Sequence, residues 1–187
     1  MKRTLYMILV TLGLLLALFM FGCAARPEEQ IKLAQKAMEQ AQEQQAAEFA
    51  PNEWGTAMQS WKDADNLLNS QKYGEATSML LRAKTRFEKA RDVAKGKRDV
   101  VIKETQGIQK TIEIRYKGVK DSLAKAKLSG KAKASVEDSC KEIDQAIEKA
   151  NAQFSQKEYN QANYTAKTVL RQVYEVEKEI EGAGKKK

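Results

Sequence analysis

The sequence predicts an all-α protein in which antiparallel helical hairpins pack on one long central helix. Three observations support this fold class. The 187 residues include only two prolines, Ala, Gln, Lys and Glu dominate the composition, and apolar residues recur at intervals of three and four along most of the chain. These residues form β-strands less readily than β-branched and aromatic residues do. We therefore expect an elongated helical body that follows a cleaved N-terminal signal helix.

Residues 1–22 predict a bacterial lipoprotein signal peptide. A Lys-Arg pair near the start precedes an apolar run over residues 5–21, and Gly22 and Cys23 follow. Lipoprotein processing needs a small residue before the cleaved bond and, after it, a cysteine that takes up a diacylglycerol and a further acyl chain such as palmitate. We expect Cys23 to be this lipid attachment site. The alternative is an uncleaved membrane anchor, because the run approaches the roughly 17 to 25 residues that span a bilayer and Met-Phe precedes Gly22, where Leu and a small residue are usual.

Lipidation would place the mature chain at the bacterial outer membrane, on its periplasmic side. Residue 24 is Ala rather than Asp, which favours the outer over the inner membrane by analogy with enteric bacteria. The net charge of +8 falls to +6 once Lys2 and Arg3 are removed. In this compartment a basic protein meets lipid head groups and cell-wall polymer. We therefore expect a membrane partner through the lipid anchor and no nucleic-acid partner.

Residues 23–50 hold the lipidated N-terminus and a weak amphipathic helix from Pro27 to Phe49. Its stripe is rich in alanine and consists of Ile31, Ala34, Met38 and Ala41. Pro51 ends this helix and suits the first turn of the next one. Two stronger stripes follow on either side of a tight connection at residues 70–72, and they predict an antiparallel hairpin. The first stripe is Trp54, Ala57, Trp61, Ala64 and Leu68, and the second is Tyr73, Ala76, Leu80, Ala83, Phe87 and Ala90.

The helix that begins at Tyr73 is expected to continue to about Lys127, since the apolar stripe continues and no proline intervenes. Such a helix is on the order of 80 Å long at 1.5 Å per residue. A break at Gly96 is the alternative. Gly130 is expected to end the helix in the left-handed conformation. Residues 51–128 would then form the first hairpin with its long basic helix.

A second hairpin over residues 131–181 repeats the first hairpin with an offset of 86 residues. Its stripes match those of the first position for position: Cys140, Ile143, Ile147, Ala150 and Phe154, then Tyr159, Ala162, Ala166, Val169, Val173 and Val176. We expect its connection to be one residue longer. Internal duplication and chance agreement both stay open. Residues 182–187 are expected to form a flexible basic tail.

The stretch Ala46-Ala47-Glu48-Phe49-Ala50-Pro51-Asn52-Glu53, followed by Ala57, Ala64, Tyr73, Ala76 and Ala83, resembles a short helical-hairpin domain of unknown function found in bacterial envelope lipoproteins. That family has an aromatic-Ala-Pro-x-Glu motif and spaced alanines. The resemblance covers about Ala46 to Ala94. It implies a periplasm-facing helical module that is tethered by lipid, and it brings no known activity.

The central helix carries the largest charge imbalance. Residues Arg82 to Lys120 include 13 Lys and Arg against 5 Asp and Glu, whereas Ala134 to Gly182 include 6 against 10. This pattern predicts docking onto anionic lipid or cell-wall polymer. Two alternatives are that the acidic second hairpin folds back on the basic helix, and that the charges form a solvated face.

Two further residues have candidate roles. Cys140 is the only cysteine left after lipidation, so in an oxidising compartment it is either buried or part of an intermolecular disulfide. Lys187 ends the chain after a Gly-Ala-Gly spacer, which resembles the major outer-membrane lipoproteins whose last lysine is joined to peptidoglycan, although the Tyr-Arg that precedes that lysine is missing here. The resemblance implies a peptidoglycan attachment at Lys187, and the alternative is that the three final lysines only form a solubilising tail.

Catalysis is not supported by the sequence. Histidine is absent, and there is no nucleophile elbow or glycine-rich phosphate loop. Without histidine or a second free cysteine we expect no metal, and we expect no cofactor. The sequence predicts a structural tether, spacer or adaptor of the envelope that acts with other envelope proteins, and the alternative is a binding module for anionic lipid or cell-wall polymer.

Overall fold

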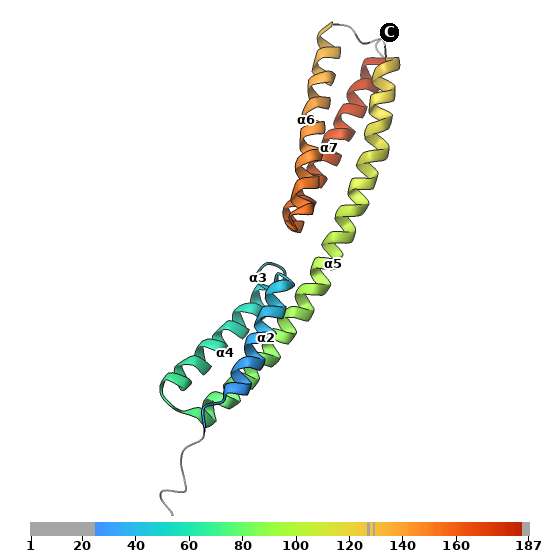
Figure 1. The fold of residues 1–187 in the computed structure, drawn as a ribbon. Coiled ribbons are helices and arrows are strands. Elements are labelled where there is room, and N and C mark those ends of the chain that lie inside the picture. The colour runs from blue at the N-terminus through green and yellow to red at the C-terminus, as the bar shows by residue number, and fades with distance from the viewer. Residues whose placement is uncertain (1–24, 127, 129, 185–187) are drawn as a thin grey trace, which may run out of the picture. The chain divides into compact units, whose positions relative to one another are not determined.

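The computed structural model describes residues 25–126, 128 and 130–184, and the protein is all α-helical over these residues (Figure 1). The helices are α2 (Glu28–Glu43), α3 (Ala46–Phe49), α4 (Pro51–Asn69), α5 (Tyr73–Lys125), α6 (Gly130–Ser155) and α7 (Tyr159–Gly184). The chain divides into two compact units, unit 1 up to Ala94 and unit 2 from Lys95. Helix α5 continues through this division, so the predicted long helix is confirmed and is not broken at Gly96.

Unit 1 packs α2, α4 and the first part of α5 around a core in which most buried residues are alanines (Figure 1). Ala34, Ala64 and Leu80 come from these three helices and meet with no exposed surface. Alanine is the best helix former, and its small side chain lets helices approach closely. The ring of Trp54 lies 5.4 Å from the ring of the fully buried Phe87, and Trp61 packs on the same core. Both tryptophans therefore pack inside unit 1, as their stripe predicts.

The first amphipathic helix is shorter than predicted, because it ends at Glu43 and a separate helix, α3, covers Ala46–Phe49. Gln45 adopts a left-handed conformation with φ 58° between them. A continuous helix would extend the buried positions Ala34, Ala37 and Ala41 to Gln45 and Glu48, which are polar. The break instead buries the apolar residues Ala46, Phe49 and Ala50, and this burial offsets the roughly 1–2 kcal/mol that a left-handed residue costs.

Unit 2 packs the rest of α5 against α6 and α7. Its core contains buried residues from all three helices, namely Ile112, Tyr116 and Val119 of α5, Val136, Cys140 and Ile143 of α6, and Ala166, Val169, Val173, Val176 and Ile180 of α7. The core residues of α6 and α7 lie on the predicted stripes except for Val136 and Ile180, and Tyr116 of α5 is a further core residue that the predicted stripe did not include. The two hairpins thus differ in the helix that covers them, since α2 covers the first and α5 covers the second.

The turns of the two hairpins have the same length and the same backbone bonds. Three residues separate α4 from α5, and three separate α6 from α7. Gln71 and Lys157 occupy equivalent left-handed positions with φ of 57° and 64°. Lys72 N donates to Leu67 O, and the equivalent residue Glu158 donates to Gln153 O, both at 2.9 Å. The expected extra residue in the second connection was therefore wrong, and the offset of 86 residues continues through the turn.

The ends of the helices differ slightly from those expected. Helix α5 ends at Lys125 rather than about Lys127. Gly130 has a positive φ of 35°, yet it is the first residue of α6 and does not end α5. Helix α7 continues to Gly184, two residues past the position where we expected the basic tail to begin.

Candidate functional site

The basic residues of α5 within unit 1 are largely held by neighbouring polar groups. The Arg86 guanidinium donates a short hydrogen bond to the Oγ of Ser60, which has no exposed surface, and Arg91 donates to Gln40 Oε1 at 3.1 Å. Lys84 pairs with Glu88 one turn later on the same helix at 2.8 Å. The two arginine contacts join α5 to α4 and α2, so they serve the packing of unit 1, whereas Arg82 and Lys89 are exposed.

In unit 2, α5 forms ion pairs with both helices of the acidic hairpin. Arg115 Nη1 lies 3.0 Å from Glu177 Oε2 of α7, and its guanidinium stacks 4.2 Å from the ring centre of Tyr174. Lys120 Nζ lies 3.0 Å from Asp144 Oδ1 of α6. The acidic hairpin therefore neutralises part of the basic helix, as one of the sequence alternatives predicts. These pairs are about half exposed and contribute little stability each.

A buried polar cluster lies where α5 meets α7. Asn163 Nδ2 donates to Thr105 Oγ1 and to Glu104 Oε2, both at 3.0 Å, and the Thr105 hydroxyl donates to the carbonyl oxygen of Val101 at 2.7 Å. Lys167 Nζ approaches Glu104 Oε1 at 2.8 Å. The hydrogen bond from Lys167, followed by that from Asn163, lowers the pKa of the Glu104 carboxyl.

The sequence analysis did not predict this cluster. It searched for apolar residues at intervals of three and four, and Thr105 and Asn163 are polar residues at buried positions. A buried polar group that is fully hydrogen-bonded fixes one alignment of its helices. The cluster therefore sets the register between α5 and α7.

Cys140 lies in the core of unit 2 and is 8% exposed. The Tyr116 hydroxyl donates a hydrogen bond to the main-chain carbonyl oxygen of Cys140 at 2.7 Å. Burial raises the pKa of the Cys140 thiol and also that of the Tyr116 hydroxyl. A raised pKa keeps the thiol protonated and unreactive. An intermolecular disulfide at Cys140 stays a prediction, and its formation would require this core to open.

Helices α5 and α6 enclose a shallow groove of about 880 Å³ on the surface of unit 2. Its lining includes the core residues Ile112, Tyr116 and Val169 and the partly buried Ile147. Gln109 and Asn151 also line it, and Gln109 Nε2 donates to Asn151 Oδ1 at 2.9 Å. The charged lining residues are Lys110, Glu113, Lys117, Lys120 and Asp121.

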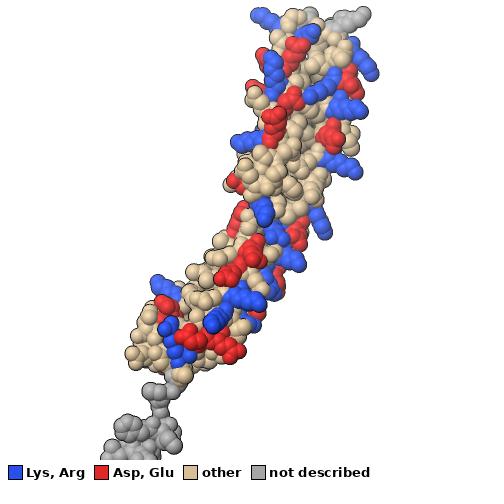
Figure 2. All heavy atoms as spheres, viewed as in Figure 1, with Lys and Arg blue, Asp and Glu red and all other residues tan. Residues whose placement is uncertain are grey.

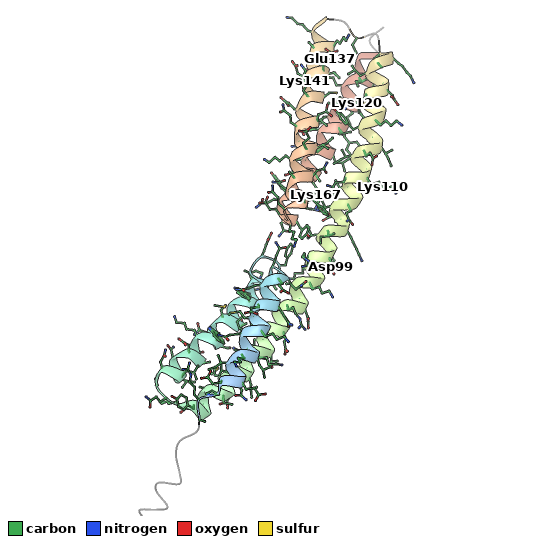
Figure 3. The ribbon with its side chains drawn as sticks, in the orientation of Figure 1. Asp99, Lys110, Lys120, Glu137, Lys141 and Lys167 are labelled. Carbon is green, nitrogen blue, oxygen red and sulfur yellow. The ribbon has the colours of Figure 1, made fainter. Side chains whose placement is uncertain are left out.

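The outward face of α5 in unit 2 carries lysines that have no carboxylate partner. Lys103, Lys110 and Lys117 are exposed, and no described carboxylate lies within 4.0 Å of their amino groups. Lys110 and Lys117 lie at the border of the groove between α5 and α6, and basic side chains recur along this edge of the unit with acidic ones between them (Figure 2 and Figure 3). We call these three lysines the lysine row. Arg82, Lys89, Lys95 and Lys97 of the predicted basic helix are likewise exposed with no described carboxylate within 4.0 Å.

Other predicted sites lie outside the described residues. These are the signal segment 1–22, the lipid attachment site Cys23 and the peptidoglycan attachment site Lys187. Within the described range no group of three or more Asp, Glu or Cys side chains is arranged to hold a metal ion. None of the described helices combines the length and apolar character that a membrane span requires.

Comparison with known proteins identifies one domain. Residues 29–99 match the family model of a domain of unknown function, DUF4398. The match covers α2, α3, α4 and the beginning of α5, so it corresponds to unit 1 and begins before Ala46, where the expected resemblance began. No curated protein and no solved structure matches the chain.

Proposed function

We propose that this protein is a lipid-anchored, periplasm-facing helical protein of the bacterial envelope that acts as a structural tether, spacer or adaptor for other envelope components. The observation that carries the proposal is the N-terminal pattern, in which a basic start and an apolar run end at Gly22 and Cys23. A helical body follows directly after this pattern. We propose the outer membrane as the location because the residue after Cys23 is Ala rather than Asp.

The short connection between the anchor and unit 1 supports a role close to the membrane. Helix α2 begins at Glu28, so only residues 24–27 separate it from Cys23. Four residues span at most about 14 Å when fully extended. A lipid on Cys23 would thus hold α2 and the domain of unknown function within a short distance of the bilayer surface.

The chemistry of the described residues supports a non-catalytic role. The groups whose pKa values are shifted by burial or by a partner, such as Glu104, Tyr116 and Cys140, contact neighbouring helices and stabilise the packing of unit 2. Glu104 and Tyr116 bond to other helices and Cys140 lies in the core, which suits a scaffold. Tyr116 also lines the groove of about 880 Å³ between α5 and α6.

The second candidate is a binding module for anionic lipid or cell-wall polymer. The lysine row favours it, because three exposed lysines on one helix face lack an intramolecular partner. A covalent link from Lys187 to peptidoglycan would serve the same purpose. Salt separates the two candidates, since lysine contacts with phosphate weaken as ionic strength rises whereas apolar contacts between helices do not.

Intact mass tests both candidates on protein recovered from cell membranes, before and after digestion of the cell wall. A mass equal to residues 23–187 plus three acyl chains is the expected result. A mass that still includes residues 1–22 would contradict the lipoprotein proposal. Recovery only after wall digestion, with wall fragments on Lys187, would instead make the protein a membrane-to-wall link. A doubled mass that reductant abolishes would establish the disulfide at Cys140.

A further inference from the structure

The lysine row follows the axis of α5 in unit 2. Lys103, Lys110 and Lys117 are seven residues apart, which is about 10.5 Å per step in an α-helix. Two helical turns separate each pair, so the three amino groups lie on nearly the same line. Tyr116, Ile112 and the other core residues of α5 lie on the opposite face, so the row points away from the core of the unit.

Pairing within unit 2 leaves the lysine row without a carboxylate partner. Arg115 and Lys120, which lie beside the row, are paired with Glu177 and Asp144 at 3.0 Å. Exposed carboxylates border the row, because Glu113 lies one turn from both Lys110 and Lys117 and Asp121 lies one turn beyond Lys117. The row is therefore a straight line of free amino groups with acidic residues at its side and end.

Branched apolar side chains accompany the lysines on this face. Val100 and Ile114 are each 65% exposed, more than most other large apolar residues of the described chain. Ile114 lies between Lys110 and Lys117 and shares their direction. A purely solvated helix face has no need of β-branched apolar residues, which form helices less readily than Ala, Lys or Glu.

We infer that this face of α5 docks on the surface of an anionic phospholipid bilayer. Lysines contact the phosphate groups, and each contributes about fivefold in affinity at such a surface. Val100 and Ile114 enter the region of the glycerol and upper acyl chains, where apolar side chains are stabilised. This inference rests on the proposed function, because the lipid on Cys23 would tether the chain that carries this face to a membrane.

Two other occupants fit the face less well. A hydrated cell-wall polymer offers phosphate or carboxylate groups to the lysines but no apolar layer to Ile114 and Val100. A second copy of the chain could offer exposed carboxylates of α6, such as Glu142 and Glu148, to the lysines, but the described residues of α6 include no exposed large apolar side chain to meet Ile114 and Val100. The bilayer is the occupant that satisfies both the charges and the apolar residues.

The test measures amine labelling of each lysine on the full mature chain, reconstituted in vesicles through its own anchor. One set of vesicles contains phosphatidylglycerol with phosphatidylcholine, and the other contains phosphatidylcholine alone. We expect several-fold slower labelling of the lysine row in the anionic vesicles at low ionic strength, and loss of this protection at high salt. Lys149 and Lys178 of the same unit, which are exposed on α6 and α7, should label equally in both vesicles.

Variants identify the groups responsible, with Lys110 as the reporter. Lys103→Gln with Lys117→Gln should weaken its protection about fivefold for each lysine removed, whereas Lys149→Gln with Lys178→Gln should not change it. Val100→Ser with Ile114→Ser should also weaken the protection if apolar residues enter the bilayer. All six positions are exposed, so the variants are expected to fold.

Several outcomes would overturn the inference. Equal labelling of the row in both kinds of vesicle would do so, as would protection that spreads equally to Lys149 and Lys178. Protection that appears in phosphatidylcholine vesicles only after cell-wall polymer is added would assign the face to the polymer, and protection that depends on protein density would assign it to a second copy. The mass of the same preparation reports the anchor separately, so failure of the proposed function is distinguished from failure of the docking face.

Discussion

The hydrogen bond between Tyr116 and the main chain of Cys140 provides a quantitative test of the core of unit 2. Tyr116 is 5% exposed, and its hydroxyl lies 2.7 Å from the carbonyl oxygen of Cys140. The substitution Tyr116→Phe removes the hydroxyl and keeps the ring in the core. A hydrogen bond contributes about 0.5–1.5 kcal/mol to the free energy of unfolding. We expect a loss of about 1 kcal/mol, which corresponds to an increase of roughly fivefold in the fraction of open molecules.

Thiol labelling of Cys140 measures this opening directly. Because Cys140 is buried and its pKa is raised, a thiol reagent modifies it mainly in molecules whose core has opened. When the core closes faster than the reagent reacts, the labelling rate follows the open fraction. Mass spectrometry of the peptide that contains Cys140 should therefore show labelling roughly fivefold faster in Tyr116→Phe. Tyr164→Phe is the matched control, because Tyr164 is 75% exposed and its loss should leave the rate unchanged.

Two results would refute the description of this core. If both variants change the labelling rate equally, the hydrogen bond from Tyr116 does not stabilise unit 2. If Cys140 of the unmodified chain reacts at the rate of a free thiol, the residue is not buried in the native protein. Far-UV circular dichroism of the variants checks that their helix content is unchanged.

Three further predictions follow from the structure. Phe87→Ala removes the ring that packs against Trp54 and should lower the free energy of unfolding by about 3–5 kcal/mol. Urea unfolding followed by tryptophan fluorescence measures this change, because both tryptophans lie in unit 1. A loss below about 1 kcal/mol would contradict the packing. Gln71→Gly should raise the same free energy by up to about 1 kcal/mol, because φ of 57° strains any residue with a side chain, and no change would argue against that conformation. Glu104→Gln should destabilise unit 2 at neutral pH but not in acid. Lys167 lowers the pKa of Glu104 in the folded state, so the stabilisation by Glu104 is complete above the usual Glu pKa of about 4.3 and is lost as pH falls through the lowered pKa. If the difference in unfolding free energy between variant and parent is the same at both pH values, the pairing is contradicted.

The fold was largely predictable because each helix keeps its apolar residues on one side. The stripes of the two hairpins become the cores of the two units, and no proline interrupts α5. The break at Gln45 was missed because turn prediction looks for Gly, Pro, Asn or Asp, and none is present there. The shift of the apolar face from Ala41 to Ala46 and Phe49 was nevertheless visible in the sequence, since it does not continue the spacing of three and four.

The open part of the basic helix was not predictable from a count of charges. Arg115 and Lys120 carry the same formal charge as Lys110 and Lys117, but only the first two lie beside carboxylates of the acidic hairpin. Which residues of α5 face α6 and α7 depends on how three helices pack. The polar cluster around Asn163 was missed for the same reason, because its partners come from another helix.

The two hairpins share one turn geometry but have cores of different composition, and only the first lies within the matched domain. At an offset of 86 residues, Ala57, Ala83, Ala90 and Ala94 correspond to Ile143, Val169, Val176 and Ile180, and all eight are buried. Four buried alanines of the first hairpin, which lies within the matched residues 29–99, thus correspond to larger side chains in unit 2. At the same offset Leu80 and Phe87 correspond to the smaller Ala166 and Val173, so the second core relies on branched aliphatic residues, whereas the first combines alanines with Phe87 and Trp54. The turn geometry and the offset are the same in both hairpins, whereas the core residues differ. A sequence comparison scores the residues, so duplication of an ancestral hairpin is compatible with a family match that covers only the first hairpin.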